Sequence, residues 1–185
     1  REVIFLQKRF GGRNRSFTLV KFATMLKNSP RIGTGDITTQ DDPRVLPFGK
    51  ILRKTKINEL PQLFNILVGD MSFVGPRPQT EKIFNYYTLD HRAIISRVRP
   101  GLTGIASIVF RDEESILAHE IDPISIERIY KENIIPYKET LDQWYVQKAC
   151  VRNYLLIIAL TAWVVVFPKS MIYTKIWKDL PEDLV

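Results

Sequence analysis

Residues 54–67 read KTKINELPQLFNIL and residues 69–78 read GDMSFVGPRP, and these two stretches decide the fold. The first predicts a helix over residues 59–67, because Asn58 is a favoured N-cap residue and Pro61 falls in the first turn, where proline is tolerated. A glycine at position 69 follows the expected helix end, as is common. The apolar side chains of this helix share one face, which we expect to pack inward; they are Leu60, Leu63, Phe64 and Leu67.

The same stretch gathers polar groups around a helix N-terminus. Unpaired backbone N–H groups there favour a bound phosphate, and Asn58 and Glu59 lie beside them. Arg77, between two prolines, sits on a stiff backbone that suits contact with a phosphate oxygen. Three basic side chains that could neutralise a diphosphate lie just upstream, at Arg53, Lys54 and Lys56. Spacing alone leaves a second interpretation open, in which Asn58 caps the helix, Glu59 complements its dipole and the lysines face solvent.

Segments of different pattern flank this stretch on both sides. Residues 2–7 and 17–22 predict the two strands of a hairpin, and residues 27–43, rich in Gly, Pro and Asp, predict a loop. The remaining expected elements are helices over 46–53, 79–97 and 122–150 (the last interrupted near Pro136), a rigid turn over 99–104 and a strand over 105–110.

Residues 154–167 form an almost wholly apolar segment. As a helix, these 14 residues would extend ~21 Å, whereas a bilayer core of ~30 Å needs about 20 residues. We therefore expect this helix not to cross a membrane. A buried core helix and an interfacial membrane helix both agree with the pattern.

Composition and charge limit the class of protein. The chain has 185 residues, of which 45% are hydrophobic and 25% charged, and we expect one folded domain over 1–185. The net charge of +7 predicts affinity for polyanions, namely nucleic acid, acidic lipids or phosphorylated substrates. A nucleic-acid-binding module is one alternative, but the chain has no recognisable base-reading or stacking motif, so we expect no nucleic acid partner.

Several further motifs occur in a definite order around residues 54–78. They are VIFLQKRFG at 3–11, KFATM at 21–25, DDPRV at 41–45 and VRPGLTG at 98–104. In this order the chain resembles the bacterial sugar transferase family, the small monotopic phosphoglycosyl transferases. The resemblance covers nearly the whole chain.

This resemblance implies a reaction. Family members transfer a sugar 1-phosphate from a UDP-sugar to undecaprenyl phosphate and release UMP, which is the first membrane step of bacterial glycan assembly. They use an Asp-Glu pair and Mg²⁺, and the aspartate attacks the β-phosphorus to give a covalent phosphosugar intermediate. Glu59 matches the glutamate of that pair and is the implied magnesium ligand.

Asn58 stands where the family has its nucleophilic aspartate. An amide is a poor nucleophile towards phosphorus, so three alternatives are open. In the first, the substitution inactivates the chain. In the second, Glu59 or the lipid phosphate itself attacks the β-phosphorus. In the third, the chain binds its substrates and turns over slowly. A silent family member would bind UDP-sugar or a partner enzyme without reaction.

Further site residues follow from the motif matches. The resemblance implies phosphate contacts for Arg53, Arg77 and Arg99, and a contact of Lys21 with the nucleotide diphosphate. Asp142 matches an acidic residue that faces the site, with a role in a cap or ion pair as the alternative. Arg111 follows the expected strand 105–110 and is expected on a sugar-facing loop, the alternative being an exposed charged turn.

The resemblance also implies a fold and a location. We expect an α+β fold, a mostly helical single domain with a small antiparallel sheet, at the cytoplasmic face of the bacterial inner membrane. Because the chain opens at Arg1 with a strand-like run, we expect it to lack the family's N-terminal re-entrant membrane helix. Residues 154–167 then become an interfacial helix in contact with membrane lipids, and its exposure favours self-association into a homo-oligomer.

Overall fold

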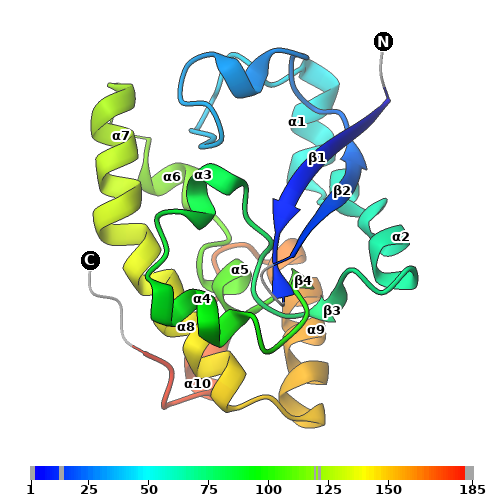
Figure 1. Ribbon diagram of the computed structural model, residues 1–185, viewed down its shortest axis with the longest axis vertical. Coiled ribbons are helices and arrows are strands. Elements are labelled where there is room, and N and C mark those ends of the chain that lie inside the picture. The colour runs from blue at the N-terminus through cyan, green and yellow to red at the C-terminus, as the bar shows by residue number, and fades with distance from the viewer. Residues whose placement is uncertain (1–2, 13–14, 119, 121, 182–185) are drawn as a thin grey trace.

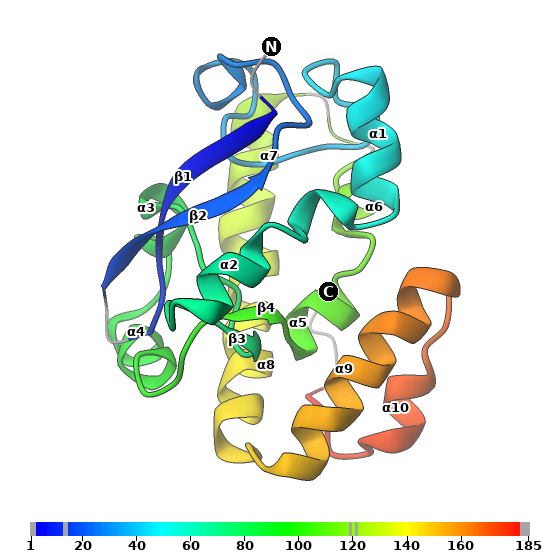
Figure 2. The same cartoon turned by 90° about the vertical axis from the view of Figure 1, so that its right-hand side faces the viewer.

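The computed structural model describes residues 3–12, 15–118, 120 and 122–181. About 49% of the chain is helical and 13% lies in strands, which confirms the mostly helical α+β fold. Figure 1 shows a long hairpin packed across a body of helices, and Figure 2 shows α1, α2 and α9 on one side of that body.

The hairpin predicted near the N-terminus is confirmed. It consists of β1 (Ile4–Phe10) and β2 (Ser16–Phe22), which pair antiparallel with Phe5 opposite Lys21 and Arg9 opposite Phe17. Because alternate residues of a strand point to the same face, Phe5, Gln7 and Arg9 project together. The hairpin therefore presents one mixed polar and aromatic face to the rest of the molecule.

A second, parallel pair of short strands was not predicted. It joins β3 (Ser72–Val74) to β4 (Gly101–Thr103), within the segment expected as a rigid turn over 99–104. The two backbones approach so closely that a Cβ atom on Gly101 would lie 2.1 Å from the nitrogen of Gly75. Only glycine at position 101 permits this pairing.

The strand expected over 105–110 is wrong, because α5 (Ile105–Val109) is a helix. A short apolar run has no period that separates a buried helix from a buried strand. Here Ile105, Ala106 and Ile108 are buried on a helix that follows β4 directly.

The helix expected over 46–53 is confirmed as α1 (Pro47–Lys54), whereas the one expected over 59–67 is divided. A 3₁₀ turn, η3 (Ile57–Glu59), precedes α2 (Gln62–Leu67). Asn58 lies inside η3 and makes no capping hydrogen bond, so its predicted N-cap role is wrong.

The orientation predicted for α2 is also wrong, because its apolar side faces outward. Leu67 is 84% exposed and Phe64 is 60% exposed, whereas Gln62 and Asn65 are buried. The Asn65 amide explains this, since its Oδ1 accepts from the N–H of Val20 at 3.0 Å and its Nδ2 donates to the carbonyl of Thr18 at 2.8 Å. These bonds along β2 hold the polar side of α2 against the hairpin.

Of the two long helices expected downstream, the one over 79–97 is divided and the one over 122–150 is continuous from residue 123 to 147. Residues 79–97 contain α3 (Glu81–Phe84) and α4 (Leu89–Ile95), separated because Thr88 caps a new helix. In the other, α7 (Pro123–Ile129) runs through a π-helical turn, η4 (Tyr130–Ile134), into α8 (Ile135–Gln147). The interruption expected near Pro136 takes the form of this π-helical turn, which ends two residues before the proline. The remaining short elements are η2 (Ser29–Arg31), α6 (Glu113–Ile116) and α10 (Ile172–Ile176).

The apolar segment near the C-terminus forms α9 (Val151–Val166), which confirms the expected helix. Its inner side packs on α5 and the core through Ile157, Leu160 and Val164. Its outer side is exposed at Leu155 and Val166. No described helix is at once long enough and apolar enough to cross a bilayer.

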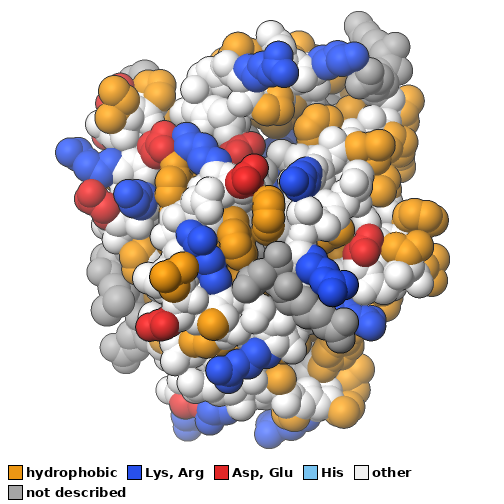
Figure 3. All heavy atoms as spheres, in the orientation of Figure 1, with side chains coloured by type: hydrophobic (Ala, Val, Ile, Leu, Met, Phe, Trp, Pro, Cys, Tyr) orange, Lys and Arg blue, Asp and Glu red, His pale blue; other side chains and the backbone are white. Residues whose placement is uncertain are grey.

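Exposed apolar side chains form one large surface, which we name the apolar face. Figure 3 shows hydrophobic side chains gathered at the right of the molecule, where Figure 1 shows α1 and α2. Figure 2 shows that α9 lies on the same side. Its members on α1, η3, α2 and α9 are Phe48, Ile51, Ile57, Leu60, Leu63, Phe64, Leu67, Leu155, Ile158 and Val166.

The polar anchoring of α2 leads to a testable expectation. Asn65→Ala should lower the free energy of unfolding by ~2–3 kcal/mol, because it leaves the Val20 N–H and the Thr18 carbonyl without partners. Leu67→Ala, two residues away on the exposed side, should change it by less than about 0.5 kcal/mol. Urea denaturation of both variants checks this, and equal losses would contradict the inverted orientation.

Candidate active site

A cavity of about 600 Å³ opens between the hairpin, the segment 29–42, α1 and η3. It collects most of the side chains predicted from the sequence. Seven of the eight line it: Lys21, Arg53, Asn58, Glu59, Arg77, Arg111 and Asp142. Arg99 instead lines a second cavity of about 440 Å³, beside Asp70 and the end of the hairpin.

Glu59 and Arg77 form an ion pair within the first cavity. The Arg77 guanidinium donates to the two carboxylate oxygens of Glu59 at 2.7 and 3.3 Å. Burial by itself would raise the pKa of Glu59, but Arg77, with smaller contributions from Lys56 and Lys21, lowers this pKa to about 2. Glu59 also raises the pKa of Arg77. The pair therefore remains ionised at neutral pH.

Asn58 lies next to this pair, and its side chain points inward. The residue is 7% exposed, and its Oδ1 is buried without a hydrogen-bond partner among the described residues. Lys56 precedes it with a φ of 60°, a left-handed conformation that costs a lysine about 1 kcal/mol or more. Such an unsatisfied oxygen and strained backbone are typical of a functional site.

Two cations of the hairpin face the same cavity. Burial is the main cause that lowers the pKa of Lys21 to about 7, and nearby Arg9 and Arg77 add to it. Burial and Arg77 likewise lower the pKa of Arg9 to about 10. The sequence analysis missed Arg9, although its spacing of two from Gln7 placed both on one face of a strand. The cavity therefore crowds positive charge where an anion would relieve repulsion.

Arg53 and Arg111 are already engaged at the opening of the cavity. Arg53 pairs with Glu114 at the start of α6. Arg111 donates to the carbonyls of Lys54 and Val164, both at 3.4 Å, and thereby links the end of α1 to α9. The segment after α5 is thus tied to both helices of the apolar face.

The floor of the cavity contains buried polar groups. Asp142 lies with its Oδ2 3.6 Å from Nε2 of His91, beyond hydrogen-bond distance. Burial raises the pKa of Asp142, and the favourable effects of His91 and Lys138 offset this only in part. Lys138 itself donates to Glu113 at 2.7 Å and to the Tyr130 hydroxyl at 3.0 Å.

The residues around Asn58 suit a magnesium ion only together with a substrate. Within the described ranges, no group of three or more His, Cys, Asp or Glu side chains could hold a metal. Mg²⁺ commonly binds one or two carboxylates and completes its coordination with water and substrate phosphates. The Glu59 carboxylate and the unpartnered Oδ1 of Asn58 fit that pattern.

Comparison with known proteins identifies the family. A model of the bacterial sugar transferase family matches residues 1–168, so the chain belongs to this family. Over 109 residues it is 42% identical to a UDP-N-acetylgalactosamine-undecaprenyl-phosphate N-acetylgalactosaminephosphotransferase of Aeromonas hydrophila, covering 58% of this chain and 26% of that protein.

Two further relatives show the same range of similarity. A UDP-glucose:undecaprenyl-phosphate glucose-1-phosphate transferase of Escherichia coli is 40% identical over 114 residues, or 57% of this chain and 23% of that protein. The exopolysaccharide production protein ExoY of Sinorhizobium fredii is 36% identical over 127 residues, or 61% of this chain and 56% of that protein. The aligned part of this chain thus corresponds to about a quarter to a little over half of these relatives.

The lowered pKa of Lys21 predicts a dependence of stability on pH. The pKa of Lys21 falls from 10.5 in the unfolded chain to about 7 in the folded protein. Below pH 7 the folded protein therefore holds an unfavourable buried charge. Between pH 7 and 10.5 the folded state has released this proton and the unfolded state still binds it, so the free energy of unfolding rises with pH. Lys21→Met should therefore be more stable than wild type at pH 6, and the difference should shrink by pH 10.

Urea denaturation at both pH values checks this expectation. Lys8→Met is the matched control, because Lys8 lies exposed on the partner strand β1, on the other face of the hairpin. A Lys21→Met difference that stays constant with pH would contradict the assignment.

Proposed function

We propose that this chain carries the catalytic site of a phosphoglycosyl transferase that moves a sugar 1-phosphate from a UDP-sugar to undecaprenyl phosphate and releases UMP. The observation that carries the proposal is the basic cavity with Asn58 and the Glu59–Arg77 pair on its wall. The names of two relatives, which pair a UDP-sugar with undecaprenyl phosphate, support this class of substrates.

The chemistry of the cavity suits a diphosphate. Lys21, Arg9 and Arg77 would contact the phosphate oxygens and offset their charge, and the approach of that charge would raise the lowered pKa of Lys21 towards its ordinary value. Glu59, with the Oδ1 of Asn58, would hold Mg²⁺. The ion would supply further charge stabilisation on the diphosphate.

Asn58 bears on the route of transfer. The lone pair of an amide nitrogen is delocalised, so Asn58 is not the attacking group. We propose direct attack: an oxygen of the lipid phosphate forms a bond to the β-phosphorus, the bond from that phosphorus to the bridging oxygen breaks, and its electron pair leaves with UMP. The cations of the cavity hold both anions in place for this step.

A second candidate function follows from the same residue. In it the chain binds UDP-sugar or a partner enzyme without turnover, because Asn58 removes the nucleophile. Buried Asn58 with its unpartnered oxygen is compatible with both functions.

Turnover distinguishes the two functions. The chain, joined to a membrane segment in nanodiscs, would be supplied with undecaprenyl phosphate, Mg²⁺ and a panel of UDP-sugars, and UMP release measured. We expect release by the wild-type chain, its loss in Glu59→Ala, and release at least about tenfold faster in Asn58→Asp, which restores a carboxylate nucleophile. Release by Asn58→Asp alone would support the silent binding function. If neither the wild-type chain nor Asn58→Asp releases UMP although both bind UDP-sugar, the proposed transferase activity is overturned.

We further propose that the apolar face rests on the cytoplasmic side of the bacterial inner membrane. Two of its members, Ile57 and Leu60, flank the Asn58-Glu59 pair in the chain, so a lipid phosphate could reach Glu59 from that side. The net charge of +7 would add attraction to anionic lipids. Without a bilayer, the same surface would favour contact between two copies of the chain.

Vesicle binding tests this placement. The double variant Phe64→Ser, Leu67→Ser should reduce partitioning into anionic vesicles by about tenfold or more, because each side chain gives up ~1–2 kcal/mol of burial. Leu89→Ser, Ile124→Ser is the matched control, since these side chains are 78% and 79% exposed on α4 and α7, away from the apolar face. Equal losses in both double variants would contradict the placement.

A further inference from the structure

One wall of the cavity is a segment with little regular structure of its own. Residues 29–42 contain only the short turn η2, and their backbone turns through positive φ angles at Gly33, Gly35 and Asp41. The cavity is nevertheless lined along this segment from Gly35 to Asp42. An irregular segment at such a position needs contacts that define its shape.

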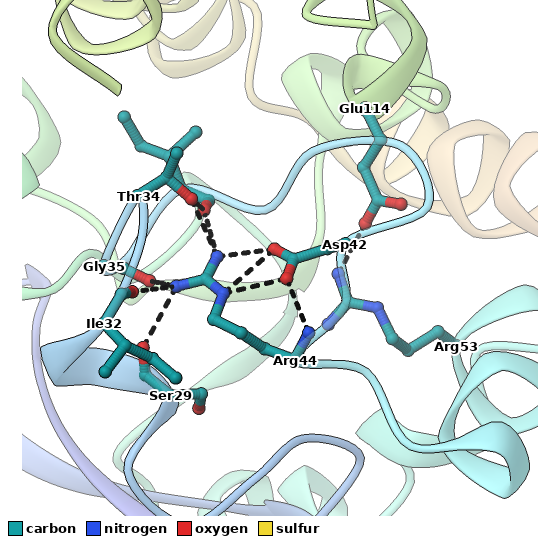
Figure 4. Close-up of polar contacts among 9 residues, drawn as sticks. Ser29, Ile32, Thr34, Gly35, Asp42, Arg44, Arg53 and Glu114 are labelled. Carbon is teal, nitrogen blue, oxygen red and sulfur yellow. Dashed lines mark hydrogen bonds and ion pairs between the residues drawn. The ribbon is translucent and has the colours of Figure 1, made fainter. Parts of the chain in front are cut away.

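Arg44 supplies these contacts from behind the wall. Its Nη1 donates to the carbonyls of Ser29, Ile32 and Gly35 at 3.0, 2.9 and 2.7 Å. Its Nη2 donates to Oγ1 of Thr34 at 2.8 Å and to the carbonyl of Ile37 at 2.7 Å. Figure 4 shows the guanidinium at the centre of these groups, and Arg44 is only 4% exposed and does not line the cavity.

Asp42 neutralises this buried charge. Its carboxylate accepts hydrogen bonds from Nε of Arg44 at 2.9 and 3.1 Å and from Nη2 at 2.5 Å. Burial would raise the pKa of Asp42, but its hydrogen bonds with Arg44 bring this pKa below its usual value. A paired and fully bonded guanidinium holds a defined geometry that an ammonium group, with three donors on one nitrogen, would not reproduce.

Three neighbouring side chains of this segment, at residues 38–40, differ in chemistry from the cations of the site. Thr38, Thr39 and Gln40 offer hydroxyl and amide groups, whereas Lys21, Arg9 and Arg77 supply the phosphate-binding charge. Neutral donors and acceptors of this kind suit the hydroxyl groups of a carbohydrate. Residues 38–40 thus offer neutral groups for hydroxyls, between the carboxylates of Asp36 and Asp41 that also line the cavity.

We propose that Arg44 is a positioning residue that holds residues 38–40 as a preformed wall for the hydroxyl groups of the donor, either on its sugar ring or on its ribose. The inference rests on the proposed function, because it takes a nucleotide sugar as the ligand. Arg44 itself touches no substrate and acts through the backbone carbonyls that it binds.

Equilibrium binding tests this role without turnover. Dissociation constants of UDP-glucose, UDP and pyrophosphate would be measured by calorimetry for wild type, Arg44→Lys and the double variant Thr38→Val, Thr39→Val. Both variants should weaken UDP-glucose about fivefold to tenfold, as expected for the loss of one or two hydrogen bonds, and leave pyrophosphate within about twofold. Unchanged UDP binding assigns the wall to the sugar, and equally weakened UDP binding assigns it to the ribose.

A second readout follows the shape of the wall directly. Trypsin should cut after the exposed Arg31 faster in Arg44→Lys than in wild type, while Arg128→Lys, an exposed arginine on α7, should match wild type. If Arg44→Lys does not fold, Thr34→Val removes a single acceptor of Arg44 and should give a smaller change of the same kind.

The outcomes separate this inference from the proposed function. Wild type that binds UDP-glucose, with variants that bind it equally well, would overturn the role of Arg44 alone. Parallel losses of UDP-glucose and pyrophosphate in Arg44→Lys would overturn it too, because they would mean collapse of the whole cavity. Wild type that binds none of the three ligands would overturn both the inference and the proposed function.

Discussion

The ion pair of Glu59 and Arg77 is the interaction on which the site depends. It joins η3 to the segment between β3 and α3, across the intervening α2. It also offsets charge in a cavity where Lys21 and Arg9 have lowered pKa values because they are buried near other cations. Because the pKa values of Lys21 and Arg9 remain lowered with Glu59 in place, this part of the cavity suits a multiply charged anion. The chain belongs to the bacterial sugar transferase family.

The site and the apolar face are built from the same short stretch. Asn58 points inward from η3, whereas Ile57 and Leu60 beside it are exposed. Asn65 fixes this arrangement by bonding along β2, which turns the apolar side of α2 outward. Residues only a few positions apart in the chain therefore face either the polar cavity or the apolar face. Arg111 extends the link, since it binds carbonyls at the ends of α1 and α9.

The fold was predictable where a local pattern had one meaning. The hairpin carried strand-like runs around a turn and α9 a long apolar run, and the predictions for both are confirmed, as is that for α1. The run 105–110 was apolar except for Ser107 and too short to show a period, so its helix was predicted as a strand. The α2 segment had a clear apolar side, but periodicity says only that such a side exists. Whether it meets a core or remains exposed depends on what the opposite side binds.

The amino-acid sequence by itself determined the family motifs, the excess of positive charge, and the Asn58-Glu59 pair beside several cations. Tertiary structure decided which of these groups meet. It brought Arg9 to the cavity through the register of the hairpin, set Arg99 in a separate cavity, and placed Arg44 behind a wall that it shapes. The physical reason is that the sequence contains each residue's type and local spacing. Its spatial neighbours, by contrast, are set by strand pairing and by buried hydrogen bonds between distant segments.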